Sequence, residues 1–410
     1  MNTTYLFNTM WVVCASVFVF AMQAGFACCE SGFARSKNAC NIWLKNLLDF
    51  CVGALVYYFI GFGLMYGDDW HGLIGINGFF NPLDQNLAIW QTYDGTLSRA
   101  AFLLFQTMFC ATTATIISGT VAERFRFDSY IIVSAFMTAL VYPVIGHWVW
   151  GGGWLSRIGF ADFAGSAAVH MCGGFAALMG AIQVGPRIGK YVNGKVNAIP
   201  GHNIPMGMLG AFILWIGWYG FNPGSELALD DVTFYTCITT TFAGAAGCLA
   251  GLFTSWIRYK KPDPTLAANG ALGGLVAVCT GVAQVSYIGS MIIGAAAGIL
   301  ITLSIEFVDH KLHIDDPVGA ISLHGVCGMT GTLLGGLLST EDGLFYGFGA
   351  SRFLAQLIGV VSIGAFVLIT TGILYFVLKK TIGIRVPKEM ELAGLDITEH
   401  GMTAYPDIMG

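Results

Sequence analysis

The sequence predicts an all-α polytopic membrane protein with eleven transmembrane helices. Three observations predict this fold class: 55% of the 410 residues are hydrophobic, only 10% are charged, and apolar stretches long enough to cross a bilayer recur along the chain. Soluble domains carry about 25% charged residues. Lipid is therefore the solvent for most of this chain. The composition excludes a disordered chain, a nucleic-acid-binding protein and an ordinary cytosolic enzyme.

Apolar stretches of about 20 residues define the predicted spans. In chain order they lie near residues 6–34, 47–67, 99–121, 129–150, 162–185, 203–223, 232–257, 265–284, 286–308, 317–339 and 350–378. If the N-terminus is outside, three of the 19 Lys and Arg residues lie on the outer side of the membrane, and the other 16 lie on the inner side. The three outer residues are Arg99, Arg157 and Arg352. Basic residues favour cytoplasmic loops. We therefore expect the N-terminus outside and the C-terminus inside a cell membrane (plasma or inner).

The domain organisation follows from these spans. Residues 1–380 form a membrane domain, and residues 381–410 form a cytosolic C-terminal segment. The membrane domain divides into halves of about 1–190 and 200–340, followed by the eleventh span near 350–378.

A nine-residue motif occurs once in each half. Asp162-Phe-Ala-Gly-Ser-Ala-Ala-Val-His170 and Asp316-Pro-Val-Gly-Ala-Ile-Ser-Leu-His324 share the form Asp-x2-Gly-x4-His at an offset of 154 residues. Five spans separate the two copies, and because five is odd, the copies cross the membrane in opposite directions. Spans 1–5 and 6–10 are therefore predicted to form an inverted five-helix repeat. Transport proteins of this design place their sites near the midplane, at the repeat interface.

His170 and His324 are the first candidate site residues. Each follows its Asp by eight residues, which is about 12 Å of helix, so both lie well inside the bilayer. A histidine at that depth indicates function because its desolvation must be offset. At matching positions in inverted halves the two rings can meet and share one proton. The alternative is two unrelated histidines, each bonded to a backbone carbonyl.

Aromatic residues at the outer ends of the spans provide a second candidate site. The ring face of Trp150 and the hydroxyl of Ser225 can bind a cation through cation–π attraction and a hydrogen bond. Phe109 and Phe221 would form a hydrophobic constriction below it. The alternative is an interfacial aromatic belt.

The belt is the preferred interpretation for Trp154 and Trp218. Asp162 and Asp316 each precede a predicted helix, which is typical of N-caps. Asp162 has a second expected role, since a carboxylate below an outer vestibule attracts cations. Neither carboxylate is expected to contact a ligand directly.

A membrane-embedded enzyme is a further class of function to weigh, and it would need a metal site. The candidate ligands are Asp309, His310, His313, Asp315 and Asp316. They fall in a predicted cytoplasmic loop, so we expect a solvated charged turn, with no metal and no cofactor.

At these residues the chain resembles the ammonium transporter family (Amt/Mep/Rh), specifically its Amt branch. The resemblance covers nearly the whole chain. It is carried by Asp162-Phe-Ala-Gly-Ser-Ala-Ala-Val-His170 and by Gly32-Phe-Ala-Arg-Ser-Lys-Asn38, Val121-Ala-Glu-Arg124, His147-Trp-Val-Trp-Gly, Trp218-Tyr-Gly-Phe-Asn-Pro-Gly-Ser225 and His324-Gly-Val-Cys-Gly328. The chain departs from the family pattern at Ser166, where a second Gly is usual, and over Val278-Cys-Thr-Gly-Val-Ala283 with Gln284.

The resemblance implies a homotrimer with one narrow pore in each eleven-helix subunit. It also assigns roles: Phe109, Trp150 and Ser225 to the outer ammonium site, Phe109 and Phe221 to a phenyl gate, His170 and His324 to a twin-histidine pair, and Asp162 to a structural position near the outer site.

The function expected from these residues is ammonium transport rather than enzymatic catalysis. NH4+ is captured outside and deprotonated, and NH3 crosses the hydrophobic pore while the proton moves separately. The alternative is an ammonium-sensing module of a receptor or sensor kinase, and this alternative predicts a fused signalling domain after Gly410. The segment 381–410 resembles the family's regulatory tail, which in many bacteria is the target of a PII-type protein.

Overall fold

The computed structural model describes residues 2–406. The fused signalling domain that an ammonium sensor would carry after Gly410 lies outside these described residues. The first half contains α1 (Thr3–Phe33), η1 (Ser36–Asn38), α2 (Ala39–Val56), η2 (Tyr57–Gly61), α3 (Phe62–Tyr66), α4 (Ile89–Thr92), α5 (Arg99–Val121), α6 (Phe127–Phe136), η3 (Met137–Val141), α7 (Tyr142–Val149), α8 (Trp154–Arg157), η4 (Ser166–Met171) and α9 (Cys172–Val184). The second half contains α10 (Ile204–Phe221), η5 (Pro223–Glu226), α11 (Asp231–Tyr259), α12 (Pro264–Val278), α13 (Tyr287–His310), η6 (Ile321–Val326) and α14 (Cys327–Leu338). These are followed by η7 (Leu344–Tyr346), α15 (Ser351–Thr381), α16 (Lys388–Ala393) and α17 (Leu395–His400).

Strands are confined to two short antiparallel pairs in loops. They are β1 (Asp69–Trp70) with β2 (Ile74–Gly75), and β3 (Tyr191–Val192) with β4 (Lys195–Val196).

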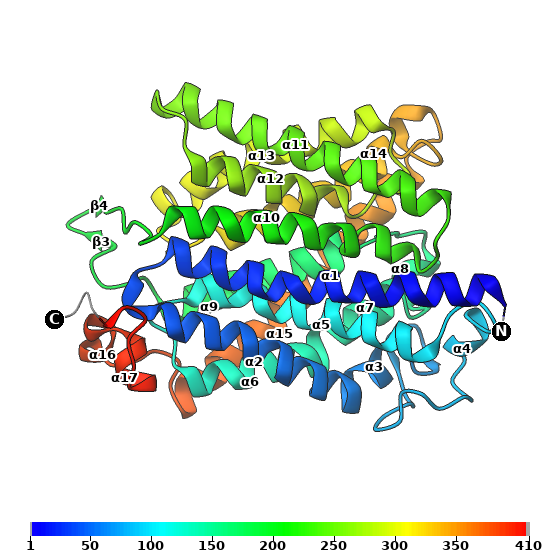
Figure 1. The fold of residues 1–410 in the computed structure, drawn as a ribbon, viewed down its shortest axis with the longest axis horizontal. Helices are drawn as coiled ribbons and strands as arrows, with labels where there is room; N and C mark the ends of the chain where they lie inside the picture. Colours follow the sequence, from blue (N-terminus) through cyan, green and yellow to red (C-terminus); the bar gives the residue numbers. More distant parts are fainter. Residues whose placement is uncertain (1, 407–410) are drawn as a thin grey trace.

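The long helices lie side by side in one bundle (Figure 1). The chain begins with α1 at one end of the bundle, and α16 and α17 lie at the opposite end. Helices α10 to α14 group on one side, and α1 packs lengthwise against α10, which joins the two halves.

Ten helices in the described residues are long and apolar enough to cross a membrane, by length and composition. The predicted span at 265–284 corresponds to a shorter helix, α12, which ends at Val278. The two carbonyls that follow bond another segment: Cys279 O accepts from Ala164 N and Thr280 O accepts from Phe163 N. The interior of the bundle covers α12, which has twelve buried residues from Ala267 to Val278.

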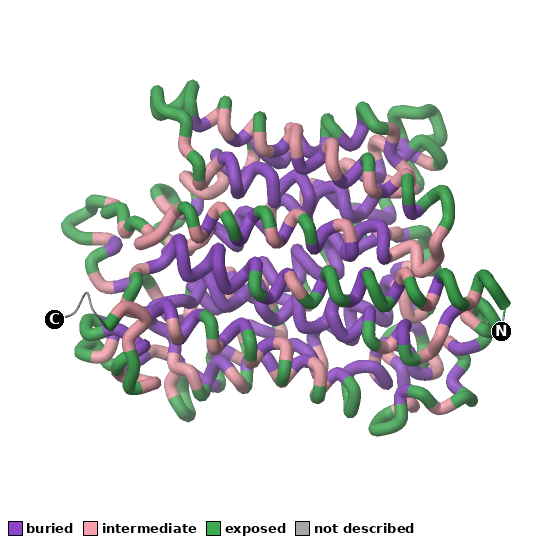
Figure 2. Tube along the Cα trace, viewed as in Figure 1, coloured by how far each residue is buried: buried purple, intermediate pink, exposed green. Residues whose placement is uncertain are grey.

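Burial separates the interior from an apolar outer surface. Buried residues fill the centre of the bundle, and exposed ones follow the outer faces of the long helices (Figure 2). Many exposed side chains are large and apolar, including Phe7 on α1, Phe212 on α10, Ile257 on α11 and Ile373 on α15. Such an extended apolar surface is costly in water and favourable in lipid.

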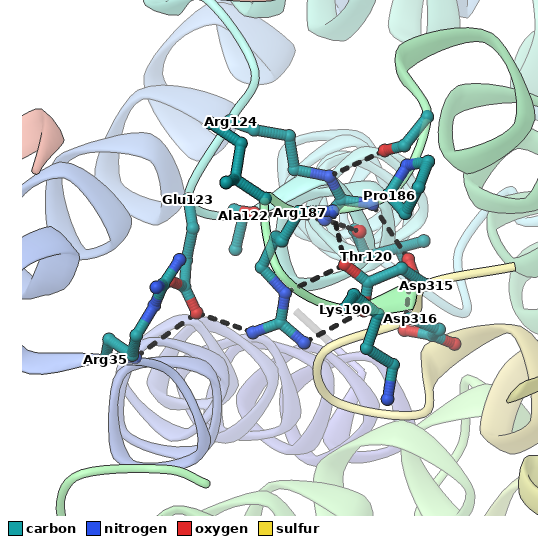
Figure 3. A network of polar contacts seen from close by, with 12 residues as sticks. Arg35, Thr120, Ala122, Glu123, Arg124, Pro186, Arg187, Lys190, Asp315 and Asp316 are labelled. Carbon is teal, nitrogen blue, oxygen red and sulfur yellow. Dashed lines mark hydrogen bonds and ion pairs between the residues drawn. The ribbon is translucent and has the colours of Figure 1, made fainter. Parts of the chain in front are cut away.

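An ion network holds together the loops at the α16–α17 end (Figure 3). Arg187 donates to Asp315 Oδ2 at 2.9 Å and to Glu123 Oε1 at 2.7 Å, and Glu123 also pairs with Arg35. Arg124 donates to the carbonyl oxygen of Asp315 at 2.8 Å. Arg187 therefore joins the loop after α5 to the loop before η6.

This network corrects the prediction of a solvated charged turn at Asp315, whereas residues 310–313 are exposed as that prediction requires. Asp315 is only 2% exposed. Burial alone would raise the pKa of Asp315, but hydrogen bonds from Arg187 and the charges of Arg124 and Arg187 outweigh it and hold the pKa well below its usual range. The carboxylate is therefore a buried, ionised partner of two arginines.

The C-terminal segment is ordered over its described part and packs on the start of α2. Asp396 accepts hydrogen bonds from the backbone N–H groups of Cys40 and Asn41. The N-cap residue of α2, Asn38, makes no capping bond of its own, and its Oδ1 accepts from Leu395 N at 2.9 Å. Asp396 thus supplies the negative charge and the acceptors that the first turn of α2 needs.

Candidate functional site

A cavity of about 170 Å³ lies near the end of α3 and the residue after α4, from which Tyr66 and Tyr93 contribute to its lining. Three of its lining residues are Phe109, Trp150 and Ser225, which the sequence predicts for the outer site. The complete lining is Tyr66, Tyr93, Phe105, Gln106, Phe109, Trp150, Phe163, Ser225 and Leu227.

Hydrogen bonds fix the two groups that can contact a cation. Trp150 Nε1 donates to the carbonyl of Asp162 at 2.8 Å, which holds the indole ring in place. Ser225 Oγ donates to the carbonyl of Phe221 at 2.8 Å. Because the hydroxyl hydrogen of Ser225 is used in this way, the oxygen lone pairs remain to accept a hydrogen bond. A donor cation is the ligand that suits this arrangement.

Phe109, at the wall of this cavity, stacks on a second phenyl ring. The ring centroids of Phe109 and Phe221 lie 4.1 Å apart at an interplanar angle of 18°. Phe109 lines the cavity, and Phe221 lies behind it and stacks on His170 at 5.1 Å. Phe109 is 2% exposed and Phe221 is fully buried. The rings therefore separate the cavity from the histidines.

His170 and His324 are in direct contact. Their Nδ1 atoms lie 3.1 Å apart, and the ring centroids lie 5.2 Å apart at 24°. His170 is 0% and His324 is 2% exposed. The two rings therefore meet as predicted, and in the described residues neither His170 nor His324 hydrogen-bonds a backbone carbonyl, which is what the alternative required.

The predicted interfacial position of Trp218 is wrong. Trp218 is only 1% exposed, and its ring stacks on His170 at 5.4 Å and 25°. The glycines Gly217 and Gly220 beside it pack against α1, where an added Cβ would lie within 2.1–2.4 Å of Met22 Cγ or Ala15 O. This close packing turns Trp218 toward the histidines and away from the membrane interface.

The first Asp-x2-Gly-x4-His motif forms one tight unit. Gly165 adopts φ 103°, a left-handed conformation that favours glycine. The turn brings four consecutive N–H groups, those of residues 165–168, onto the carboxylate of Asp162, which also accepts from Thr280 Oγ1 at 2.7 Å. The η4 π-helix that follows carries His170. These five hydrogen bonds show that the Asp162 carboxylate stabilises the start of the helix.

The second copy of the motif has the same local geometry. Gly319 has φ 79°, and Asp316 accepts from the N–H groups of Gly319 and Ile321 and from Thr120 Oγ1. The π-helix η6 follows and carries His324. In each copy Asp and Gly build the helix start, and the π-helical turn presents the histidine. Single π-helical turns are frequent at functional sites.

A second cavity, of about 30 Å³, lies on the other side of the histidines. His324 lines it, together with Phe26, Cys29, Glu30, Phe33, Ile116, Leu214, Asn269, Leu272, Val318, Ala320 and Leu323. The order of contacts is therefore first cavity, Phe109, Phe221, His170, His324, second cavity. If the N-terminus is outside, as the sequence predicts, the first is the outer cavity and the second is the inner cavity.

Several lining residues were missed by sequence reasoning. Gln106 lies one helical turn before Phe109 in an apolar span, which is a signal that could have identified it. Tyr66 and Phe163 come from loop-adjacent positions whose approach depends on the fold. Glu30 and Asn269 are polar residues in apolar stretches, and that feature alone marks them as functional candidates.

The metal alternative finds no support in the described residues: they contain no group of three or more His, Cys, Asp and Glu side chains that could hold a metal ion. Asp309 instead pairs with Lys190 at 2.8 Å and accepts from Tyr191. Asp315 is bound to Arg187, and Asp316 caps the start of η6.

Comparison with known proteins decides the family. The model described as Ammonium Transporter Family matches residues 10–405. The chain belongs to the ammonium transporter family. It is 42% identical to ammonium transporter Amt2 of Archaeoglobus fulgidus, across 98% of this chain and 88% of the relative. It is 34% identical to the ammonium transporter of Bacillus subtilis, across 98% and 99%.

Solved structures agree with this membership in the ammonium transporter family. A structure titled Sensor Amt Protein superposes with a TM-score of 0.91 at 38% identity, covering 96% of this chain and 98% of that one. Candida albicans Mep2 superposes with a TM-score of 0.87 at 28% identity, covering 98% and 91%. Together with the apolar helices, membership makes this chain a multi-pass membrane protein of a transporter family.

The departures from the ammonium transporter pattern have structural roles. Ser166 Oγ donates to Val276 O at 2.9 Å and accepts from Thr280 N at 2.8 Å. Gln284 accepts from Arg352 Nη2 and donates to Glu341. Ser166 therefore ties the start of η4 to the end of α12, and Gln284 belongs to a loop outside both cavities.

Proposed function

We propose that this chain transports ammonium by binding NH4+ in the outer cavity, removing its proton and conducting NH3 past the histidine pair. The observation that carries the proposal is the 3.1 Å contact between His170 and His324, in a buried path between two cavities.

Capture uses the groups fixed at the outer cavity. The Ser225 oxygen accepts one ammonium hydrogen, and the ring of Trp150 faces the charge. Phe109 forms the third side of the site. Asp162 supplies negative potential from below without contact, because its own oxygens are occupied by five protein donors.

Selection follows from the barrier below this site. Ammonium and potassium are similar in size, so a rigid size filter separates them poorly. The stacked rings of Phe109 and Phe221 open onto a path with few polar groups, and a bare cation is very costly there. Ammonium can lose a proton and cross as neutral NH3, whereas potassium cannot.

The histidine pair moves the proton. One Nδ1 must carry hydrogen and the other must accept it at 3.1 Å. Passing a proton along this contact reverses the two roles and leaves the pair neutral again. NH3 moves beside the rings, and NH4+ re-forms at the inner end.

The proposed transmembrane arrangement is eleven spans, an outer N-terminus and an inverted repeat. The opposite ends occupied by the start of α1 and by α16–α17 support an odd number of spans. The matching turns at Gly165 and Gly319 support the repeat. In this arrangement α12 is the eighth span and is carried by its neighbours, since its 15 residues rise only about 22 Å.

The C-terminal segment is proposed to be regulatory. The hydrogen bonds between Asp396 and the start of α2 support a regulatory role. A PII-type protein that bound the segment could move α2 through these contacts. A homotrimer in the cell membrane is proposed from the resemblance.

Ammonium pulses applied to proteoliposomes on a solid-supported membrane test the function. Transport predicts a charge-displacement current that persists as ammonium is raised and decays faster with more protein per vesicle. A sensor module without transport predicts at most a small binding transient whose decay is independent of protein density.

A further inference from the structure

Glu30 is a buried carboxylate that no step above uses. It lies on α1 and is 3% exposed. It borders the inner cavity with His324 and is the one carboxylate among the cavity's described lining residues. The cavity, at about 30 Å³, can hold a water molecule, since one needs roughly 10–15 Å³ of such space.

The contacts of Glu30 leave one of its oxygens available. Asn46 Nδ2 donates to Glu30 Oε2 at 3.0 Å, and Asn46 Oδ1 accepts from Thr115 Oγ1 at 2.8 Å. In the described residues Asn46 is the only donor within strict hydrogen-bond geometry, and the hydroxyl of Ser118, which has no other partner, also lies beside the carboxylate. Asn46 therefore holds the carboxylate by one oxygen and leaves the other to exchange a proton.

Glu30 lies near two charged side chains of opposite sign. The charged side chains near Glu30 are Lys45 and Asp49, which are both buried on α2. The sequence predicts Lys45 in a cytoplasmic loop, and the structure corrects this. Asp49 is bound by the hydroxyl of Tyr130 at 2.6 Å. The elements that face Glu30 from the other sides contribute neutral groups, Ser118 on α5 and Asn269 on α12. Lys45 places a positive charge near Glu30, and the negative charge of Asp49 opposes its effect.

The second ring nitrogen of His324, Nε2, is available to exchange a proton at this cavity. Its Nδ1 is engaged with His170, so Nε2 is the atom through which a proton leaves the pair. Because Glu30 and His324 line the same small cavity, one water can connect them.

We propose that Glu30 accepts the proton from the histidine pair and returns it to ammonia at the inner end of the pore. This proposal rests on the transport function given above. In the first step an O–H bond forms on Glu30 as the N–H bond of His324 breaks. In the second, the O–H bond breaks and NH3 becomes NH4+, which restores the carboxylate. No oxidant or reductant is needed.

Glu30→Gln is the informative variant because it keeps the shape and can still bond Asn46, but cannot exchange a proton. Full-length protein in proteoliposomes should show an ammonium-evoked current at least tenfold below wild type. Binding, measured as the shift in Tm that ammonium chloride produces, should be unchanged. Glu30→Asp keeps a carboxylate and should restore most of the current with an altered dependence on the inner pH.

Asp49→Asn is the matched control, since Asp49 is an equally buried carboxylate of the same cluster but does not line the cavity. It should keep most of the wild-type current. A wild-type current in Glu30→Gln would overturn the role of Glu30, as would equal losses in Glu30→Gln and Asp49→Asn. If Glu30→Gln fails to fold, the test is Glu30→Asp. A current that depends on the inner pH as the wild-type current does would then overturn the role of Glu30. A wild type without sustained current overturns the transport function, and the role of Glu30 with it.

Discussion

The Nδ1 atoms of His170 and His324 lie 3.1 Å apart, although the two residues are 154 positions apart in the chain. Each ring is presented by a π-helical turn that follows an Asp and a left-handed Gly. The contact therefore depends on two local motifs in distant parts of the chain.

Asp162→Ala should destabilise the protein strongly. It removes the acceptor of the N–H groups of residues 165–168 and of Thr280. Each buried donor left without a partner costs about 1–3 kcal/mol, so we expect a loss of about 3 kcal/mol or more. Thermal unfolding in detergent measures it. Asp162→Asn retains one acceptor oxygen and should lie between wild type and Ala; equal stability of all three proteins would contradict the structural role.

Gly165→Ala should destabilise by two separate effects. A left-handed φ of 103° costs a non-glycine residue about 1–2 kcal/mol, and the new Cβ would lie 2.6 Å from Val169 Cγ2. Gly152 is the matched control because it has φ 79° and nothing within 4 Å of an added Cβ. Thermal unfolding should show a clearly larger loss for Gly165→Ala than for Gly152→Ala. Similar losses would mean that the contact with Val169 is unimportant.

Asp315 should make stability depend on pH in the acid range. Its pKa in the folded protein is held well below the ordinary value of about 3.9 by Arg187 and Arg124. Stabilisation from this group is therefore fully present above the unfolded-state pKa, and it is lost as pH falls through the folded-state pKa. Asp315→Asn should lower Tm at pH 7, since breaking a buried pair costs about 3–5 kcal/mol. The difference in Tm between wild type and variant should shrink below pH 4, and a constant difference would contradict this account.

Ser225→Ala and Trp150→Leu should weaken ammonium binding. A hydrogen bond to a charged group contributes about 1.5–3 kcal/mol, so loss of the Ser225 acceptor should raise the half-saturating ammonium concentration about tenfold or more. Loss of the Trp150 ring face should remove about 0.5–2 kcal/mol. Concentration dependence of the ammonium-evoked current measures both. Unchanged half-saturation in both variants would exclude this cavity as the binding site.

Sequence patterns predicted what depends on local periodicity and on repeated motifs. The apolar stretches located the long helices, and the repeat of Asp-x2-Gly-x4-His singled out both histidines. Patterns failed where tertiary contacts decide. Trp218 has an amphipathic side chain suited to an interface, and only the packing of Gly217 and Gly220 on α1 turns it inward.

The loop network shows the same limit. Charged residues such as Asp315 are typical of solvated turns, and its burial depends on Arg187, 128 positions away. Just beyond the end of α12, the carbonyls of Cys279 and Thr280 likewise accept from Ala164 and Phe163, which lie in the first half of the chain. No local signal in either segment carries this information.

The most direct test of the central claim is the ammonium-evoked current of a variant in which His170 and His324 are both replaced by Leu. Its Tm and its secondary structure by circular dichroism serve as the controls for folding. If the proton leaves ammonium and passes along the two rings, the current should fall to that of protein-free liposomes while the fold is retained. A folded double variant that keeps the wild-type current would contradict the account.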